Sequence, residues 1–296
     1  MIKNLRAVWV AGLLGALLPQ QMHAAASATT PNQCSKELVR QIPARKSRAA
    51  SGSDFVRDIM KLRGPARDAA VAEEVKSGNV PDFLRRLTPV KLSGKAATGE
   101  DLDIVICVTP DYLAVGADSD YVRVPMGLPT AADLAENFGF ILPTTTMVDA
   151  IYQQADVRLA PSPMTPGAQM ESTDYFWRHN QTVEAQRVKA GEQSHAALVA
   201  GQKKDIVLTT RLRSKVGRVA IYGWHRLSGK PIQPLSTVHG ESYADYSHGV
   251  RLVSQTAFVN GVKRPLMQLL QDPQIAGILS REGPISQPDR LLASLR

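Results

Sequence analysis

The chain has two cysteines, Cys34 and Cys107, and their pairing would constrain the fold more than any other sequence feature. In an oxidising compartment two thiols tend to form a disulfide. This bridge would close a loop of about 70 residues and stabilise the fold by roughly 4 kcal/mol, because it restricts the unfolded chain. The alternative is that Cys107 is a catalytic nucleophile, but it lies in the apolar run 103–108, where burial favours the neutral thiol. We predict a disulfide between Cys34 and Cys107.

The first 26 residues have the three parts of a secretory signal peptide. Lys3 and Arg6 form a basic start, the stretch 7–18 carries no charge, and small residues follow at 24–26. A membrane span needs roughly 20 apolar residues, so an uncleaved anchor is the weaker alternative. We expect residues 1–26 to be removed and the mature protein to be periplasmic or secreted, with no integral membrane span.

Composition and charge exclude several classes of protein. With 44% hydrophobic and 21% charged residues, the chain is typical of a globular protein rather than a disordered or fibrous one. The formal net charge is +8, and it becomes +6 if Lys3 and Arg6 leave with the signal peptide. Acidic partners are therefore favoured, and for an exported chain these are envelope or extracellular polymers rather than nucleic acid. No motif indicates a cofactor.

The hydrophobic pattern changes along the mature chain from helical to strand-like spacing. The stretch 34–87 has apolar residues at helical intervals, with a break at Gly64-Pro65. Strand-like runs follow at 103–108, 112–115, 121–124, 205–208, 218–222 and 249–253. Because strands and helices are grouped rather than alternating, we predict an α+β fold. It would have an N-terminal helical segment, then mainly antiparallel β-sheet regions with flanking helices.

A proline-rich stretch at 161–167 separates the two strand-rich regions. We predict a helical cap plus a first β region over 27–160, and a second β region over 161–296. One single domain over 30–296 is the alternative. Near the end, Asn260-Gly261 is the turn sequence of a β-hairpin, and a helical tail follows it.

Polar and aromatic residues concentrate in the block 222–251, which contains three of the five histidines that follow the signal peptide. Such residues make a poor core, because each imidazole, phenol and indole has a polar atom that needs a partner when buried. We therefore expect a cleft here. The catalytic candidates are His248, Asp245, His239 and Glu241, and the substrate-binding candidates are Tyr222, Trp224, His225, Tyr243, Tyr246 and Arg251.

Acid–base catalysis is the chemistry that these candidates fit best. His248 could act as general acid or base with Asp245 to orient it, or Glu241 and Asp245 could form a carboxylate pair like that of glycosidases. Ser247 lies next to His248, but the Gly-x-Ser-x-Gly motif of serine hydrolases is missing.

Two further interpretations of the block remain open. A metal site would use His225, His239 and His248 with Asp245, but the spacing of the histidines matches no compact ligand motif, and we expect no metal. Alternatively the whole block is structural, with packed aromatics and an ion pair between Asp245 and Arg251.

A basic run precedes the block and is opposed only by Asp205. Its members are Lys203, Lys204, Arg211, Arg213, Lys215 and Arg218. The run either attracts an anionic polymer or forms a solvated surface. The leading hypothesis is therefore a hydrolase of a cell-envelope or extracellular polymer, such as a glycan or peptidoglycan. The alternative is a non-catalytic envelope protein that binds an anionic glycan or a protein partner.

The stretches 204–208 and 217–223, followed by His239 and 249–251, resemble the β-strand half of NlpC-type cell-wall peptidases, which have a papain-like fold. The resemblance covers about 45 residues. Arg218 stands where that family has its catalytic histidine, and Cys107 lies too far upstream to be its catalytic cysteine. The resemblance implies a strand topology and a role at peptidoglycan, without a catalytic pair.

Overall fold

The N-terminal part of the described chain is helical, as the sequence predicts. The computed structural model describes residues 33–191, 195 and 197–295, so the predicted signal peptide lies outside the description. Ser51 caps the first α-helix by accepting a hydrogen bond from the Asp54 N–H at 3.2 Å. The helical elements here are η1 (Lys36–Val39), α1 (Gly52–Ile59), α2 (Gly64–Lys76) and η2 (Asp82–Arg85).

The largest sheet joins strands from the first half of the chain to strands near its C-terminal end. Its order is β1-β2-β12-β13, all antiparallel, and the short β5 also pairs with β12. The Asn260-Gly261 hairpin is confirmed, with positive φ angles of 47° and 83° as a two-residue turn of this kind requires. The strands are β1 (Thr88–Lys95), β2 (Asp101–Val108), β5 (Phe140–Ile141), β12 (Val253–Val259) and β13 (Val262–Pro265).

A second sheet has the order β10-β9-β8-β11, in which only the β8–β11 pair is parallel. Two small ribbons, β3–β4 and β6–β7, complete the strands of the described chain. These strands are β3 (Ala114–Ala117), β4 (Asp120–Arg123), β6 (Val157–Arg158), β7 (Val199–Ala200), β8 (Lys204–Ile206), β9 (Ile221–His225), β10 (Pro231–Ser236) and β11 (His248–Gly249).

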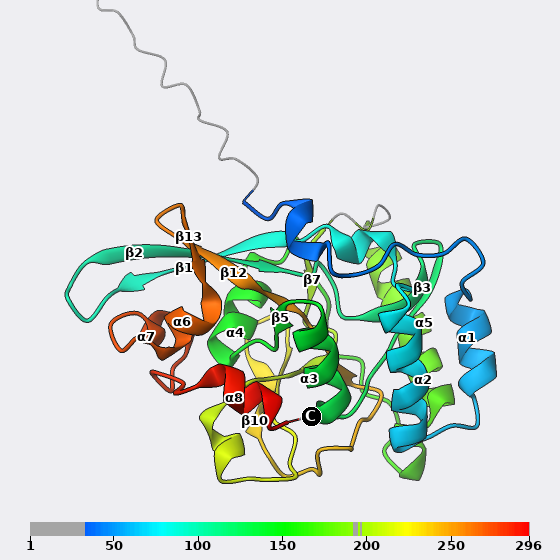
Figure 1. Cartoon of the computed structure of the whole chain (residues 1–296). Helices are drawn as coiled ribbons and strands as arrows, with labels where there is room; N and C mark the ends of the chain where they lie inside the picture. Colours follow the sequence, from blue (N-terminus) through cyan, green and yellow to red (C-terminus); the bar gives the residue numbers. More distant parts are fainter. Residues whose placement is uncertain (1–32, 192–194, 196, 296) are drawn as a thin grey trace, which may run out of the picture. The chain divides into compact units, whose positions relative to one another are not determined.

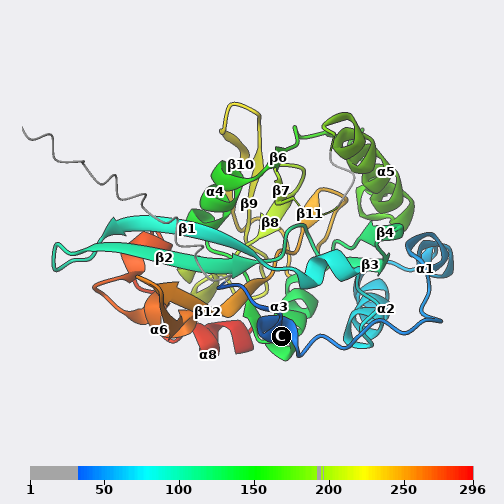
Figure 2. The ribbon, with the colours of Figure 1, turned by 90° about the horizontal axis from the view of Figure 1, so that it is seen from above.

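Helices flank both sheets (Figures 1 and 2). Helix α4 contacts β1 of the first sheet and β9 of the second, while α5 packs against β4. The class is therefore α+β, as predicted. The remaining helices are α3 (Leu128–Asn137), α4 (Thr145–Gln154), η3 (Ala168–Glu171), α5 (Thr173–Lys189), η4 (Thr210–Arg213), α6 (Leu266–Gln271), α7 (Ala276–Leu279) and α8 (Pro288–Ala293).

The predicted disulfide between Cys34 and Cys107 is present. It joins the segment that precedes η1 to the buried end of β2, where Cys107 has no exposed surface. The described residues belong to one compact unit, and β2 pairs with β12 across the predicted boundary at 160. The division into two folding regions stays a prediction. No helix in the described ranges is long and apolar enough to cross a bilayer.

Candidate functional site

The two ends of the block 222–251, residues 222–225 and 244–251, lie inside the molecule, whereas the stretch between them keeps exposed surface. His248 and Asp245 are 0% and 1% exposed, so neither carboxylate nor imidazole faces solvent. The other buried members are Tyr222, Trp224, His225, Tyr246 and Arg251. The candidates that keep exposed surface are His239, Glu241 and Tyr243, each of which is half-buried. Contact with a polymer at this surface would therefore begin at 239–243.

His248 and Asp245 lie together but are not hydrogen-bonded. His248 Nε2 is 3.9 Å from Asp245 Oδ2, and neither ring nitrogen has a hydrogen-bond partner within the described chain. Asp245 accepts hydrogen bonds from the Ser247 N–H at 2.7 Å and from the Tyr243 hydroxyl at 3.3 Å. The pair is thus held by backbone and neighbours rather than by a direct bond.

The environment sets the protonation of this pair. Burial lowers the pKa of His248 to about 4, although Asp245 opposes the shift. Burial would raise the pKa of Asp245, but His248, Lys204 and the hydrogen bonds from Ser247 lower it to about 2. At neutral pH a neutral imidazole therefore lies beside a carboxylate, which is the state that a general base requires.

A row of rings connects this pair with the surface. The His239 ring stacks on Tyr243, with centroids 4.1 Å apart and an angle of 11° between the planes. The rings of Tyr243 and His248 in turn make an edge-to-face contact, with centroids 5.6 Å apart. The structure thus brings four of the predicted residues into one cluster, His239, Tyr243, Asp245 and His248.

Trp224 has an uncommon backbone conformation and does not present its ring to solvent. Its φ is 54°, in the left-handed region that a bulky residue seldom adopts, and Gly223 before it has φ 106°. The backbone N–H of Trp224 donates to the Lys203 carbonyl at 3.1 Å, which holds this part of β9 beside the residue that precedes β8. The indole packs with Tyr175, Phe176 and Tyr246, so it is a core residue in this arrangement.

Tyr222 and His225 belong to a different polar group, one that sequence reasoning missed. Asp149 on α4 accepts a hydrogen bond from the Tyr222 hydroxyl at 2.9 Å and lies 2.9 Å from His225 Nε2. Arg281 adds an ion pair to Asp149 at 2.6 Å. Burial would raise the pKa of Asp149, but these hydrogen bonds lower it. Within the described chain, the carboxylate partner of Tyr222 and His225 is therefore Asp149 and not Asp245.

The alternative that Arg251 pairs with Asp245 is wrong. The Arg251 guanidinium donates to the carbonyls of Thr109 and Val199, each at 2.7 Å, and its Nε lies 3.9 Å from Asp205. Arg251 is completely buried, and these contacts join the segment after β11 to the end of β2 and to β7. Burial raises the pKa of its neighbour Asp205 to about 6.

A second buried network, also absent from the sequence reasoning, joins β4 to α5. The Arg123 guanidinium forms ion pairs with the carboxylates of Asp111 at 2.6 Å and Glu184 at 2.7 Å. It also donates a hydrogen bond to the Asn180 side-chain oxygen at 3.0 Å. Burial would raise the pKa of Asp111, but Arg123 lowers it. Removal of either partner would leave an uncompensated buried charge, so the network fixes the position of α5 against β4.

The exposed part of the basic run lines a groove of about 320 Å³ between η4 and α8. We call it the basic groove. Its cations are Arg213, Lys215 and Arg290, and the acid in its wall is the predicted Glu241. Buried leucines at 212, 291 and 295 also line it. The Glu241 N–H donates to the Gly217 carbonyl at 2.9 Å, which joins the loop of the block to the basic run.

The chain's described residues contain no group of three or more His, Cys, Asp or Glu that could hold a metal ion. At the position where NlpC-type peptidases have their histidine, Arg218 is exposed and donates to the Val238 carbonyl at 2.7 Å. No protein-family model, curated protein or solved structure matches the chain. The arguments for function therefore rest on geometry.

Proposed function

We propose that the protein is an exported, non-catalytic binding protein of the cell envelope, and that its basic groove binds an anionic polymer. The observation that carries this proposal is the set of cations in the groove wall. Arg213 donates to the Ser286 carbonyl and Arg290 to Gln287 at 3.4 Å, and neither pairs with an acid in the described chain. Lys215 is exposed and has no ion pair there.

The chemistry of the groove suits a charged glycan. Unpaired cations attract successive carboxylates or phosphates, and this attraction weakens as salt rises. The apolar lining near Leu291 and Leu295 can pack against the C–H faces of sugar rings. Export is supported by the signal-like start of the sequence, and the disulfide is compatible with an extracellular place.

Titration calorimetry of the mature protein with polygalacturonate, and with neutral dextran as reference, tests the proposal. The test variant combines Arg213→Gln, Lys215→Gln and Arg290→Gln. A control variant removes the same charge elsewhere, through Lys61→Gln, Arg226→Gln and Lys230→Gln at exposed positions. We expect the groove variant to bind about tenfold or more weakly, since several charged contacts are lost. Equal binding by both variants would contradict the proposal.

A hydrolase that acts in the same groove is the second candidate. Glu241 lies in the groove wall, and His239, Tyr243, Asp245 and His248 form the contacting cluster in the same block. Mass spectrometry of soluble fragments, after incubation of envelope and extracellular polymers with wild type, Glu241→Gln or His248→Ala, distinguishes the two functions. Fragments that only the wild type releases would establish a hydrolase. A polymer that binds but is not cut favours the binding protein.

A further inference from the structure

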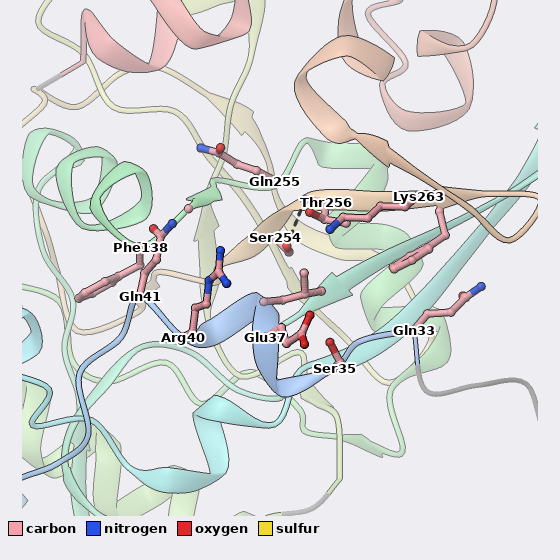
Figure 3. Close-up of a pocket in the computed structure, with 13 residues that line it drawn as sticks. Gln33, Ser35, Glu37, Arg40, Gln41, Phe138, Ser254, Gln255, Thr256 and Lys263 are labelled. Atoms are coloured by element: carbon pink, nitrogen blue, oxygen red, sulfur yellow. Dashed lines mark hydrogen bonds between the residues drawn. The ribbon is translucent and has the colours of Figure 1, made fainter.

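A larger pocket, with a volume of about 550 Å³, lies between η1 and β12 (Figure 3). Figure 1 shows η1 at the top of the view and α8, which borders the basic groove, near the bottom. We call this space the disulfide pocket, because the segment that follows Cys34 forms one wall. Its lining includes Ser35, Glu37 and Arg40 on the η1 side and Ser254, Thr256 and Lys263 on the side of β12 and β13.

Two features of the fold build the pocket. The disulfide holds the η1 segment beside β2, while the backbone hydrogen bonds that η1 itself makes in the described chain are local, such as Leu38 N–H to the Ser35 carbonyl. On the opposite wall, β12 has a register shift between Val253 and Ala257 where it pairs with β2. A bulge of this kind turns side chains out of the regular ladder and is common next to functional sites.

Two cationic side chains, those of Arg40 and Lys263, line the pocket. Figure 3 shows Arg40 and Lys263 reaching into the space from opposite walls, with Ser254 and Thr256 between them. Neither cation has a hydrogen bond or an ion pair to the part of the chain that the structure describes. Glu37 is the acid in the lining. The arrangement leaves both cations available to one carboxylate, which binds such donors more strongly than a neutral group does.

The remaining lining suits a ring with several hydroxyl groups. Ser35, Gln41 and Gln255 bring hydroxyl and amide groups to the pocket, and half-buried Phe258 adds an apolar surface against which a sugar ring can pack. The volume is within the range of about 300 to 1,000 Å³ that is typical of small-molecule sites.

We propose that the disulfide pocket binds an acidic sugar, a single ring with one carboxylate and several hydroxyls. The carboxylate lies between Arg40 and Lys263, and the hydroxyls contact the polar side chains of β12. The inference does not depend on the proposed function of the basic groove, because the two sites share no lining residue.

Calorimetric titration of the oxidised mature protein with galacturonic acid tests this site. Galactose has the same ring without the carboxylate, and inorganic phosphate supplies an anion without the ring. We expect galacturonic acid to bind about tenfold more tightly than either reference, the loss expected when one charged hydrogen bond is removed. Equal affinity for galactose, equal affinity for phosphate, or no binding of galacturonic acid would each overturn the proposal.

Variants then place the sugar in this pocket. Arg40→Gln and Lys263→Gln each change an exposed side chain and are expected to weaken binding about tenfold while the protein stays folded. Arg264→Gln is the matched control, because Arg264 follows Lys263 on β13 and side chains alternate between the two faces of a strand. Loss of affinity in the control alone, or in none of the three, contradicts the assignment. The triple groove variant keeps its affinity for galacturonic acid.

Discussion

The basic run 203–218 divides into two parts that have the same kinds of residue and opposite environments. Lys203 is 1% exposed, and its ammonium donates to the Tyr246 carbonyl at 2.6 Å. The ammonium of Lys204 lies 3.7 Å from the Asp245 carboxylate and over the ring of Trp224. Lys215 and Arg218, by contrast, are exposed. The inner cations are held by contacts within the fold, whereas the exposed cations are free to contact a ligand.

Truncation of the buried Lys203 is expected to have the largest effect on the free energy of unfolding. Lys203→Ala should lower the free energy of unfolding by roughly 3 to 5 kcal/mol, because it leaves a cavity, an unpaired Tyr246 carbonyl and an altered charge near Asp245. Lys215→Ala, the matched exposed change, should alter it by less than about 0.5 kcal/mol. Urea unfolding of both variants measures the difference, and similar losses would remove the distinction between the two parts of the run.

The buried histidine makes a pH-dependent prediction. The pKa of His248 is about 4 in the folded protein, against 6.5 in an unfolded chain, so the unfolded state binds more protons between these pH values. The wild type should therefore lose about 3 kcal/mol of stability relative to His248→Gln as the pH falls from 7 to 4. Asp205, whose pKa is raised to about 6, is present in both proteins and cancels from the difference.

Unfolding of the two proteins by urea at pH 4, 5, 6 and 7 checks this slope. Parallel stability curves for wild type and His248→Gln would show that the imidazole is not held neutral by burial.

A smaller effect is expected at the link between the surface and the buried cluster. Tyr243→Phe removes the 3.3 Å hydrogen bond to Asp245 and keeps the ring stacked on His239, so about 1 kcal/mol of stability should be lost. His239→Ala removes the stacking partner instead and serves as a comparison. If the Phe variant is as stable as the wild type, the hydroxyl does not support Asp245.

The smallest change in stability is expected in the basic groove. Lys215→Gln should leave the free energy of unfolding within about 0.5 kcal/mol of the wild type. It should nevertheless weaken binding of polygalacturonate and reduce the dependence of the affinity on salt, because one fewer counterion is displaced. Calorimetry at two salt concentrations measures both quantities. An unchanged salt dependence would remove Lys215 from the binding surface.

The features of the fold that were predicted correctly depend on residues close together in the sequence or on a simple count of one residue type. The hairpin at Asn260-Gly261 follows from the positive φ angles that these residues tolerate, and the helical N-terminal part follows from apolar spacing. The disulfide was predicted because only one pair of cysteines exists. Each inference needs a short pattern or a simple count.

The candidate site could be predicted only in part, because burial of polar residues depends on distant segments. The composition of 222–251 predicted a cleft, yet His225 lies against Asp149, which is 76 positions away in the chain. The basic groove unites Lys215 and Glu241 with Arg290, and no local pattern relates these three residues.

The sequence by itself determined the α+β class, the disulfide and the position of the hairpin, since periodicity and turn residues act locally and the chain has only one pair of cysteines. Only the tertiary structure decided that His248, Asp245 and Lys203 are enclosed while Arg213 and Lys215 remain at the surface. The physical reason is that the cost of burying a charge is offset by partners that long-range packing supplies, and their positions are not encoded in any short stretch of chain.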